Sequence, residues 1–259
     1  MNSYNSYVKI YLNTFFNLLN MNNLELLKVY HFDKKIRCGI NADGGYVFGD
    51  LEGGYDCYIS AGISTEESFS RDFIDKYNMN ENNSFGFDGT VVDYPYEYTN
   101  KISFIKKNIG SVDDDSNTNL SFLIDKYSDI FLKMDIEGGE YPWLLSIDEE
   151  QLGKFKQIVI EFHGITNDGG WGCSYDNKIK CLEKLSKTHY IIHAHGNNHA
   201  HTFDSIPDVI ELSCINKKYF GQSVPKLNTT PLPIPNLDFP NNIYLNYDIN
   251  LNFYPFVNK

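Results

Sequence analysis

Arginine is nearly absent from this chain: Arg37 and Arg71 are the only two among 259 residues. Asp and Glu together number 34 against 22 Lys and Arg, which gives a formal net charge of -12 at pH 7. A surface this acidic repels phosphate backbones, so we expect no nucleic-acid partner. A small cationic ligand is compatible with the same charge.

Paired cysteine motifs and long apolar runs are also missing. The five cysteines are an odd number and form no CxxC, so reduced thiols in a cytoplasmic protein are the simplest interpretation. The N-terminus lacks the positively charged start and uninterrupted apolar stretch of a secretory signal. No apolar run approaches the roughly 18 residues that a membrane span needs. The sequence therefore predicts a cytoplasmic protein without a membrane span.

The pattern that is present is an alternation of strands and helices, which predicts an α/β fold with a mostly parallel sheet and helices on both faces. The last two predicted strands are joined only by a loop, which favours an antiparallel pair at the sheet edge. Ser64 and Glu67 have the spacing of a capping box at the start of the first core helix. The predicted strands are 55–61, 84–87, 102–106, 130–134, 157–162, 190–195 and 209–216, and the predicted helices 65–77, 119–127 and 177–187.

Three segments follow from this pattern. Residues 1–36 are predicted to be an N-terminal helical cap, because residues 7–27 have helical apolar spacing. A docking helix and a homodimer contact are the alternatives for that segment. Residues 37–220 form the α/β domain, and residues 221–259, rich in Pro and Asn, are expected to wrap around it irregularly.

The residues at two predicted strand ends indicate a nucleoside-binding pocket. YISAGIS (Tyr58–Ser64) ends one strand, and Gly62 would let the backbone approach a ligand closely. FGFDGT (Phe85–Thr90) ends the next, and an acid at Asp88 can accept hydrogen bonds from both hydroxyls of a ribose. Because GxGxxG is absent, a dinucleotide is poorly supported, whereas S-adenosylmethionine (SAM) fits the pattern. An ordinary strand–helix turn and a turn-forming Asp88 before Gly89 are the alternatives.

A carboxylate and histidine group is predicted at the ends of two later strands. Asp135 ends the apolar strand in LKMDIEGGE, and Glu161 and His163 end the following strand in IVIEFH. Adjacent parallel strands lie about 4.8 Å apart, so these side chains are expected to converge at the carboxyl edge. Such a group can serve as a general base or hold a divalent cation. The alternative pairs Glu161 with a lysine and leaves His163 satisfying a loop.

A run of histidines and a glycine-rich loop complete the candidate residues. YIIHAHGNNHAH (Tyr190–His201) suggests a zinc site, but no cysteine joins it, and a substrate contact by His195 or Asn197 is favoured. In DGGYV (Asp43–Val47) the two glycines permit unusual backbone angles, and Tyr46 is positioned to cover a ligand. A tight structural turn is the alternative for this loop.

These motifs together resemble the FkbM-type SAM-dependent methyltransferases. The signature LKMDIEGGE (Leu132–Glu140) is accompanied, in the family's order, by DGGYV, FGFDGT, IEFH, HAHGNN and IPDVIELSCINK, over roughly residues 40 to 220. YISAGIS departs from the more glycine-rich loop of many SAM enzymes. The resemblance implies a Rossmann-like class I methyltransferase fold, with a mostly parallel seven-stranded sheet and a late antiparallel strand. It also implies methyl transfer, usually to oxygen, on sugars or other secondary metabolites.

The expected roles follow from the resemblance and the strand ends together. The acceptor is expected to be a small-molecule or nucleotide-sugar hydroxyl, such as a sugar of a capsule or surface polysaccharide. A sugar hydroxyl is a weak acid and needs a base or a metal ion, for which Mg²⁺ or Mn²⁺ suits these ligands. A metal-dependent hydrolase or isomerase built on the histidines and a non-catalytic nucleotide-sugar binding module are the competing functions. The assigned residues are Asp135, His163 and Glu161 for catalysis or a metal; Ala61, Gly62, Ser64, Asp88, Gly89 and Asp135 for the cofactor; and Tyr46, Glu137, His195 and Asn197 for the substrate.

Overall fold

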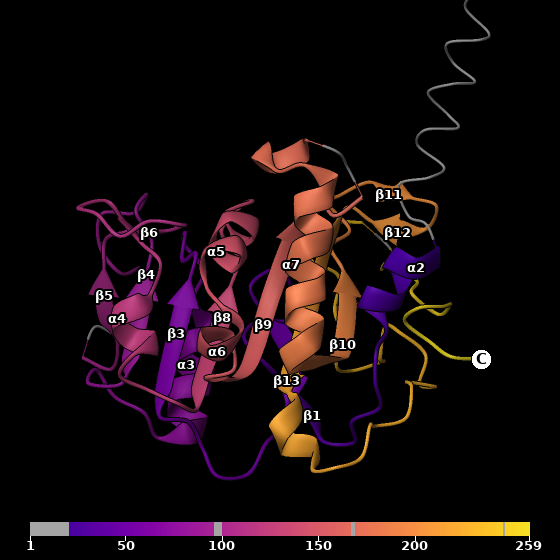
Figure 1. Ribbon diagram of the computed structural model, residues 1–259, viewed down its shortest axis with the longest axis horizontal. Helices are drawn as coiled ribbons and strands as arrows, with labels where there is room; N and C mark the ends of the chain where they lie inside the picture. Colours follow the sequence, from indigo (N-terminus) through magenta and orange to yellow (C-terminus); the bar gives the residue numbers. More distant parts are fainter. Residues whose placement is uncertain (1–20, 96–99, 167–168, 246) are drawn as a thin grey trace, which may run out of the picture.

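The centre of the molecule is a seven-stranded sheet of order β10-β13-β9-β8-β3-β4-β5 (Figure 1). The computed structural model describes residues 21–95, 100–166, 169–245 and 247–259. Strand β13 is antiparallel to both of its neighbours, and the other pairs are parallel. The predicted mostly parallel sheet with a late antiparallel strand is therefore confirmed. Its strands are β3 (Cys57–Ala61), β4 (Ser84–Phe87), β5 (Ser103–Ile105), β8 (Ile130–Met134), β9 (Phe155–His163), β10 (His189–Gly196) and β13 (Val209–Asn216).

Both faces of the sheet are covered, because alternate residues of the central strands are buried on opposite sides. On one face, Ile59 of β3 belongs to the larger apolar cluster, which includes residues of α5 (Glu140–Ser146) and α7 (Tyr175–Thr188). On the other face, the Tyr58 ring packs on Phe73 of α3 (Ser68–Tyr77), with ring centroids 4.6 Å apart. Figure 1 shows α4 (Ser121–Ile124), α5, α6 (Glu149–Leu152) and α7 in front of the sheet and α3 behind it.

Smaller elements surround this sheet. Strands β1 (Lys35–Cys38) and β2 (Tyr46–Gly49) form an antiparallel hairpin against the α3 side of the core. The remaining elements are α2 (Met21–Leu24), η1 (Glu25–Leu27), η2 (Gly170–Gly172), η3 (Lys217–Phe220), and the pairs β6 (Asn108–Ile109) with β7 (Asn117–Thr118) and β11 (Thr202–Phe203) with β12 (Ile206–Pro207).

The predicted capping box is wrong. Helix α3 begins at Ser68, and its N-cap residue is Glu67, whose side chain makes no capping hydrogen bond. Glu67 is buried instead, where its carboxylate accepts hydrogen bonds from Ser60 at 2.8 Å, from Ser70 and from Tyr94 at 3.2 Å. A buried carboxylate needs such donors, and this requirement outweighs the local capping preference.

The predicted helix over residues 119–127 is also longer than the helix observed. Helix α4 spans only Ser121–Ile124, after Leu120 in a left-handed conformation (φ 68°). Leu120 is fully buried, so its packing sets the backbone here against the helical tendency of the flanking residues.

The two ends of the chain differ in what the structure describes. The predicted cap falls mostly on residues 1–20, which lie outside the described residues, so the docking and homodimer readings stay predictions. Among the residues described after Phe220, no helix or strand is assigned, and this segment packs beside the β10 edge (Figure 1). No helix within the described ranges has the length and apolar character that crossing a membrane requires.

Candidate active site

A cavity of about 490 Å³ opens at the carboxyl ends of β3, β4 and β8. Its floor includes Gly62, Asp88 and Asp135, one from each strand end, and the β1–β2 hairpin supplies Asp43 and Tyr46. Ligand-binding cavities commonly have volumes of about 300–1,000 Å³ and lie at this edge of α/β sheets. The cavity therefore has the size and place of a small-molecule site.

Gly62 brings two strand ends into contact. Its φ is +79°, and a Cβ atom there would lie 1.5 Å from the carbonyl oxygen of Asp135. The Asp135 N–H donates to the Ala61 carbonyl at 2.9 Å, and the buried Lys133 ammonium donates to the Gly62 carbonyl at 2.8 Å. Only glycine fits this turn, because its backbone packs directly against that of Asp135. The close approach of this backbone to a ligand stays a prediction.

Asp88 joins the loops that follow β3 and β4. One carboxylate oxygen accepts hydrogen bonds from the backbone N–H groups of Ile63 and Ser64, both at 3.0 Å. The other accepts from the N–H and hydroxyl of Thr90, at 2.7 and 2.6 Å. Partial burial raises the pKa of Asp88, but these bonds outweigh it and lower the pKa to about 2. A ribose contact stays a prediction, and it would require Thr90 to share or give up its bonds.

Two further predicted cofactor residues act through the backbone. Ala61 is fully buried and does not line the cavity, so its carbonyl is what holds the β8 end in place. At Gly89 a Cβ atom would lie 2.4 Å from the side-chain oxygen of Asn108, so a side chain there would require Asn108 to move.

Strand register places a row of ionisable side chains across four strands. Met134 is paired with Ile160, which puts Asp135 beside Glu161. Glu161 is paired with Glu211, and Glu211 with His195. Residues at the same level on neighbouring strands point to the same face of a sheet. The row therefore runs from the cavity at Asp135 to the edge strand at His195.

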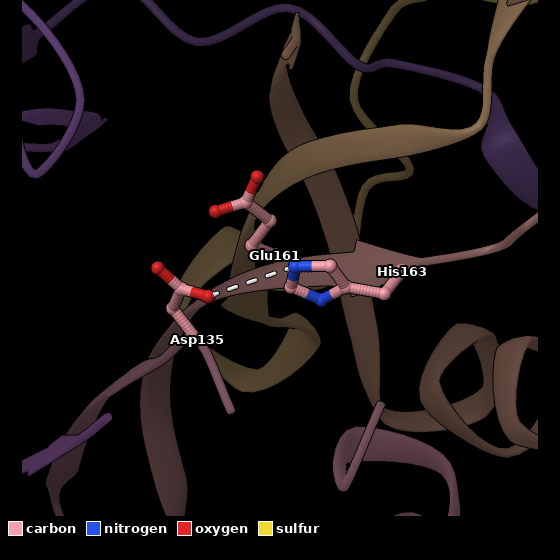
Figure 2. Close-up of side chains that lie close together, drawn as sticks. All are labelled: Asp135, Glu161 and His163. Atoms are coloured by element: carbon pink, nitrogen blue, oxygen red, sulfur yellow. Dashed lines mark ion pairs between the residues drawn. The ribbon is translucent and has the colours of Figure 1, made fainter. Parts of the chain in front are cut away.

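Asp135, Glu161 and His163 converge as predicted (Figure 2). Each offers an oxygen or nitrogen atom, and these atoms lie within 4.8 Å of one another. The His163 Nε2 atom is 3.9 Å from Asp135 Oδ1 and 3.4 Å from Glu137 Oε2. The Tyr46 hydroxyl donates to Asp135 Oδ2 at 3.0 Å. Within the described part of the chain, this is the one group of histidine and acid side chains whose ligand atoms lie close enough together to hold a metal ion.

Burial determines the electrostatics of this group. Burial and the nearby Asp135 and Glu211 raise the pKa of the Glu161 carboxyl well above its usual range. One donor, the Asn197 side-chain amide at 2.7 Å, only partly offsets this effect. Burial lowers the pKa of His163, but the Glu140 hydrogen bond and neighbouring carboxylates outweigh it and raise the pKa. Glu161 thus favours its neutral form, while His163 is a stronger base than a free imidazole.

Glu140 belongs to the acidic group that the sequence indicated after the strand ending at Asp135, but no catalytic, cofactor or substrate role was assigned to it. It is fully buried in the first turn of α5 and lies 3.2 Å from His163 Nδ1. Its second contact is the Ile136 N–H, which donates to the same oxygen at 3.1 Å. If His163 Nδ1 carries the proton, Nε2 is left facing Asp135 and Glu137. The signal that could have assigned this role is the place of Glu140 five residues after Asp135, where helix α5 begins.

Two histidines of the run, His193 and His195, are engaged in structural contacts. His193 Nε2 lies 2.8 Å from Asp238, and His195 lies 3.2 Å from Glu211 and 3.0 Å from Asp248. Both imidazoles are buried and belong to no group with metal-ligand geometry in the described ranges. Neither His195 nor Asn197 lines the cavity, so direct substrate contacts by them stay a prediction.

Tyr46 and Glu137, the other two predicted substrate residues, do line the cavity. Tyr46 is buried and forms a wall of it, and Glu137 has a largely exposed side chain. The DGGYV loop is braced by Arg37, which donates to the carbonyls of Ile40 and Ala42 at 2.8 and 2.9 Å. These bonds favour the tight-turn alternative over a mobile cover.

The mostly parallel seven-stranded sheet agrees with the fold that the motifs predicted. The family model of the FkbM methyltransferase domain matches residues 13–203. Because this match covers well over half of the chain, the protein belongs to the FkbM methyltransferase family, and the resemblance drawn from the motifs is confirmed. A search of curated proteins and one of solved structures gave no match. Family membership implies a class I methyltransferase fold, in agreement with the seven-stranded sheet.

Proposed function

We propose that this methyltransferase transfers a methyl group from SAM to a hydroxyl oxygen of a sugar. The observation that supports this function is that Asp135 belongs both to the cavity and to the histidine and acid group. It lines the cavity at the carboxyl ends of β3, β4 and β8, and it belongs to the group that includes Glu161 and His163. A methyl donor in the cavity would therefore lie next to residues suited to bind and deprotonate an acceptor.

The cavity suits a cationic nucleoside cofactor. Gly62, Ser64, Asp88 and Asp135 would hold it, and their carboxylates complement the positive charge of its sulfonium and ammonium groups. When bound, SAM supplies an activated methyl group, so the protein must mainly align the acceptor and accept its proton.

His163 is the residue we assign to the proton. Its Nε2 atom faces Asp135 and Glu137, while Glu140 holds Nδ1. The raised pKa strengthens its basicity, and the adjacent carboxylates stabilise the imidazolium that forms. Asp135 and Glu137 are placed to accept hydrogen bonds from the acceptor's hydroxyl groups.

In a second version of this proposal, a divalent cation assists removal of the acceptor's proton. Asp135, Glu161 and His163 would hold Mg²⁺ or Mn²⁺, whose positive charge would also stabilise the ionised form of Glu161. Such an ion would lower the pKa of the acceptor hydroxyl. Loss of activity in EDTA and its recovery with Mn²⁺ or Mg²⁺ would support this version. Activity indifferent to EDTA would favour His163 as the direct base.

The biological setting is proposed by family analogy. Sugars of capsules or surface polysaccharides, some of them nucleotide-activated, are the acceptors that the resemblance suggests, and a cytoplasmic location is proposed with them. This analogy rests on the fold family rather than on a residue of the site.

The central experiment combines binding and product analysis. Calorimetric titration should detect SAM and S-adenosylhomocysteine but not NAD. Incubation with SAM and a panel of sugars and nucleotide sugars should add one methyl group to an acceptor, detected by mass spectrometry. Absence of SAM binding by the folded protein would overturn the proposed function.

A further inference from the structure

Trp171 is a half-exposed indole beside the proposed base. Its side chain lies against the His163 ring, with centroids 4.8 Å apart and planes tilted by 55°. The residue retains 47% of its accessible surface. The other tryptophan of the chain, Trp143, is fully buried in the core. Trp171 therefore offers free aromatic surface at the site, whereas Trp143 does not.

The indole packs closely against two glycines, which have no side chain that would collide with it. A Cβ atom at Gly138, in the LKMDIEGGE segment, would lie 2.9 Å from Trp171 Cβ. A Cβ atom at Gly164, directly after His163, would lie 2.4 Å from Trp171 Cδ1. The indole is thus held against the two segments that carry the proposed acceptor-binding residues.

The backbone that carries Trp171 is strained and anchored. Trp171 has φ +56°, an unusual conformation for a bulky residue, between glycines that could adopt it freely. The buried Lys178 ammonium donates to the carbonyls of Gly164 and Gly170, at 2.5 and 2.9 Å. Local strain of this kind persists where the surrounding structure holds it, and it is common at ligand sites.

We propose that Trp171 is an acceptor-binding residue on which a neutral or amino-sugar ring stacks. The C–H face of a pyranose matches the apolar indole face, and its hydroxyls can donate to Glu137 and Asp135. These carboxylates disfavour an acidic sugar in the same place, because like charges repel. This inference rests on the proposed sugar O-methylation and adds the surface that recognises the ring.

The test compares Trp171→Ala and Trp171→Phe with the parent protein, and Tyr254→Ala serves as the control. Tyr254 is an exposed aromatic whose ring faces the Lys28 ammonium, and it does not line the cavity. The probes are methyl glycosides of glucose, galactose, mannose and glucosamine, the corresponding uronates, UDP-glucose and UDP-galactose, and catechol as a non-sugar hydroxyl. Kinetics of methyl transfer give kcat and KM, and calorimetry gives the affinity for S-adenosylhomocysteine.

For a methylated sugar, Trp171→Ala should raise KM about tenfold, with kcat changed by less than about twofold. Trp171→Phe should raise KM less, and neither change should alter S-adenosylhomocysteine affinity. In the parent protein, the bound sugar should shift the fluorescence emission of Trp171. In the Trp171→Phe variant only the buried Trp143 remains, so the tryptophan emission should not change.

The outcomes separate the two proposals. Sugar methylation with an unchanged KM in Trp171→Ala would overturn the stacking role and leave the proposed function intact. Preference for a uronate over its neutral sugar would also overturn it. Methylation of catechol, with no sugar methylated and no shift in emission, would overturn the sugar acceptor and the stacking role together.

Discussion

Two carboxylates at the same edge of the sheet behave in opposite ways. Asp88, at the β4 end, accepts four hydrogen bonds from residues close to the strand ends, and its pKa falls to about 2. Glu161, at the β9 end, accepts one from Asn197 and lies near two other carboxylates, and its pKa rises well above the usual range. The number of donors and the neighbouring charges, rather than the residue type, decide which form is stable.

The same difference separates two parts of the carboxyl edge of the sheet. We call the ends of β3 and β4 the cofactor half, and the ends of β8, β9, β13 and β10 the catalytic half. Near β3 and β4, backbone N–H groups of the adjoining loops satisfy the acid. Near β9, β13 and β10, the acids depend on side chains that come from distant segments. Asn241 of the C-terminal segment donates to Glu211 at 2.7 Å and to Asp43 at 3.2 Å. We therefore expect substitutions in the catalytic half to affect both stability and catalysis.

The largest effect is expected at His195 of β10, which forms an ion pair with Asp248 of the C-terminal segment. His195→Gln would leave Glu211 and Asp248 without their buried cation and should lower the free energy of unfolding by about 3–5 kcal/mol near pH 6. Urea unfolding monitored by circular dichroism would measure this loss. An unchanged midpoint would contradict a stabilising role for the pair.

The pH dependence of that stability gives a second readout. Burial lowers the pKa of His195, but Glu211 and Asp248 outweigh it and raise the pKa to about 10, above the ordinary value near 6.5. The native state therefore binds the proton more tightly, and the contribution is complete below about pH 6.5 and lost as pH rises through 10. The difference between the parent protein and His195→Gln should shrink steadily between pH 7 and 10.

Asp135→Asn should break the catalytic half while sparing the cofactor half. The amide keeps the shape but loses the charge, so turnover should fall about 10²-fold or more. S-adenosylhomocysteine lacks the sulfonium charge that Asp135 would complement in SAM, so its affinity, measured by calorimetry, should remain close to that of the parent. Full activity in both Asp135→Asn and His163→Ala would remove the catalytic assignment.

Asp88→Asn should weaken the cofactor half. The amide keeps one acceptor oxygen, so it can accept from Ile63 and Ser64 or from Thr90 but not from both, and the link between the two loops weakens. We expect SAM affinity to fall by about 2 kcal/mol, the range for a hydrogen bond to a charged group. A matched change at an exposed acid, Asp93→Asn, should leave affinity unchanged. Normal SAM binding by a folded Asp88→Asn variant would disprove the pocket assignment.

The smallest effect is expected at Tyr46, where the two halves meet. Tyr46→Phe removes only the hydroxyl that donates to Asp135 and keeps the buried ring. Activity should fall by about fivefold, equivalent to about 1 kcal/mol, with little change in cofactor affinity. A loss as large as that of Asp135→Asn would mean that the hydroxyl itself takes part in proton removal.

Local features of the sequence predicted much of the fold. The strands at 84–87, 130–134 and 209–216 have the predicted bounds, because short apolar runs between turn residues specify them directly. The convergence of Asp135, Glu161 and His163 was predictable as well, since parallel strands end at the same edge. The motifs were sufficient to identify the family.

Contacts between distant segments could not be predicted in the same way. The buried place of Glu67 depends on Tyr94, and the histidine pairs depend on Asp238 and Asp248, far along the chain. The role of Glu140 became visible only when α5 was placed against the β9 end.

The sequence by itself thus determined the order of elements, the family and the residues at each strand end, because these follow from local pattern and spacing. The tertiary structure alone decided the protonation tendencies of those residues and the place of Trp171. Both depend on burial and on donors brought together from distant parts of the chain, which no local pattern records.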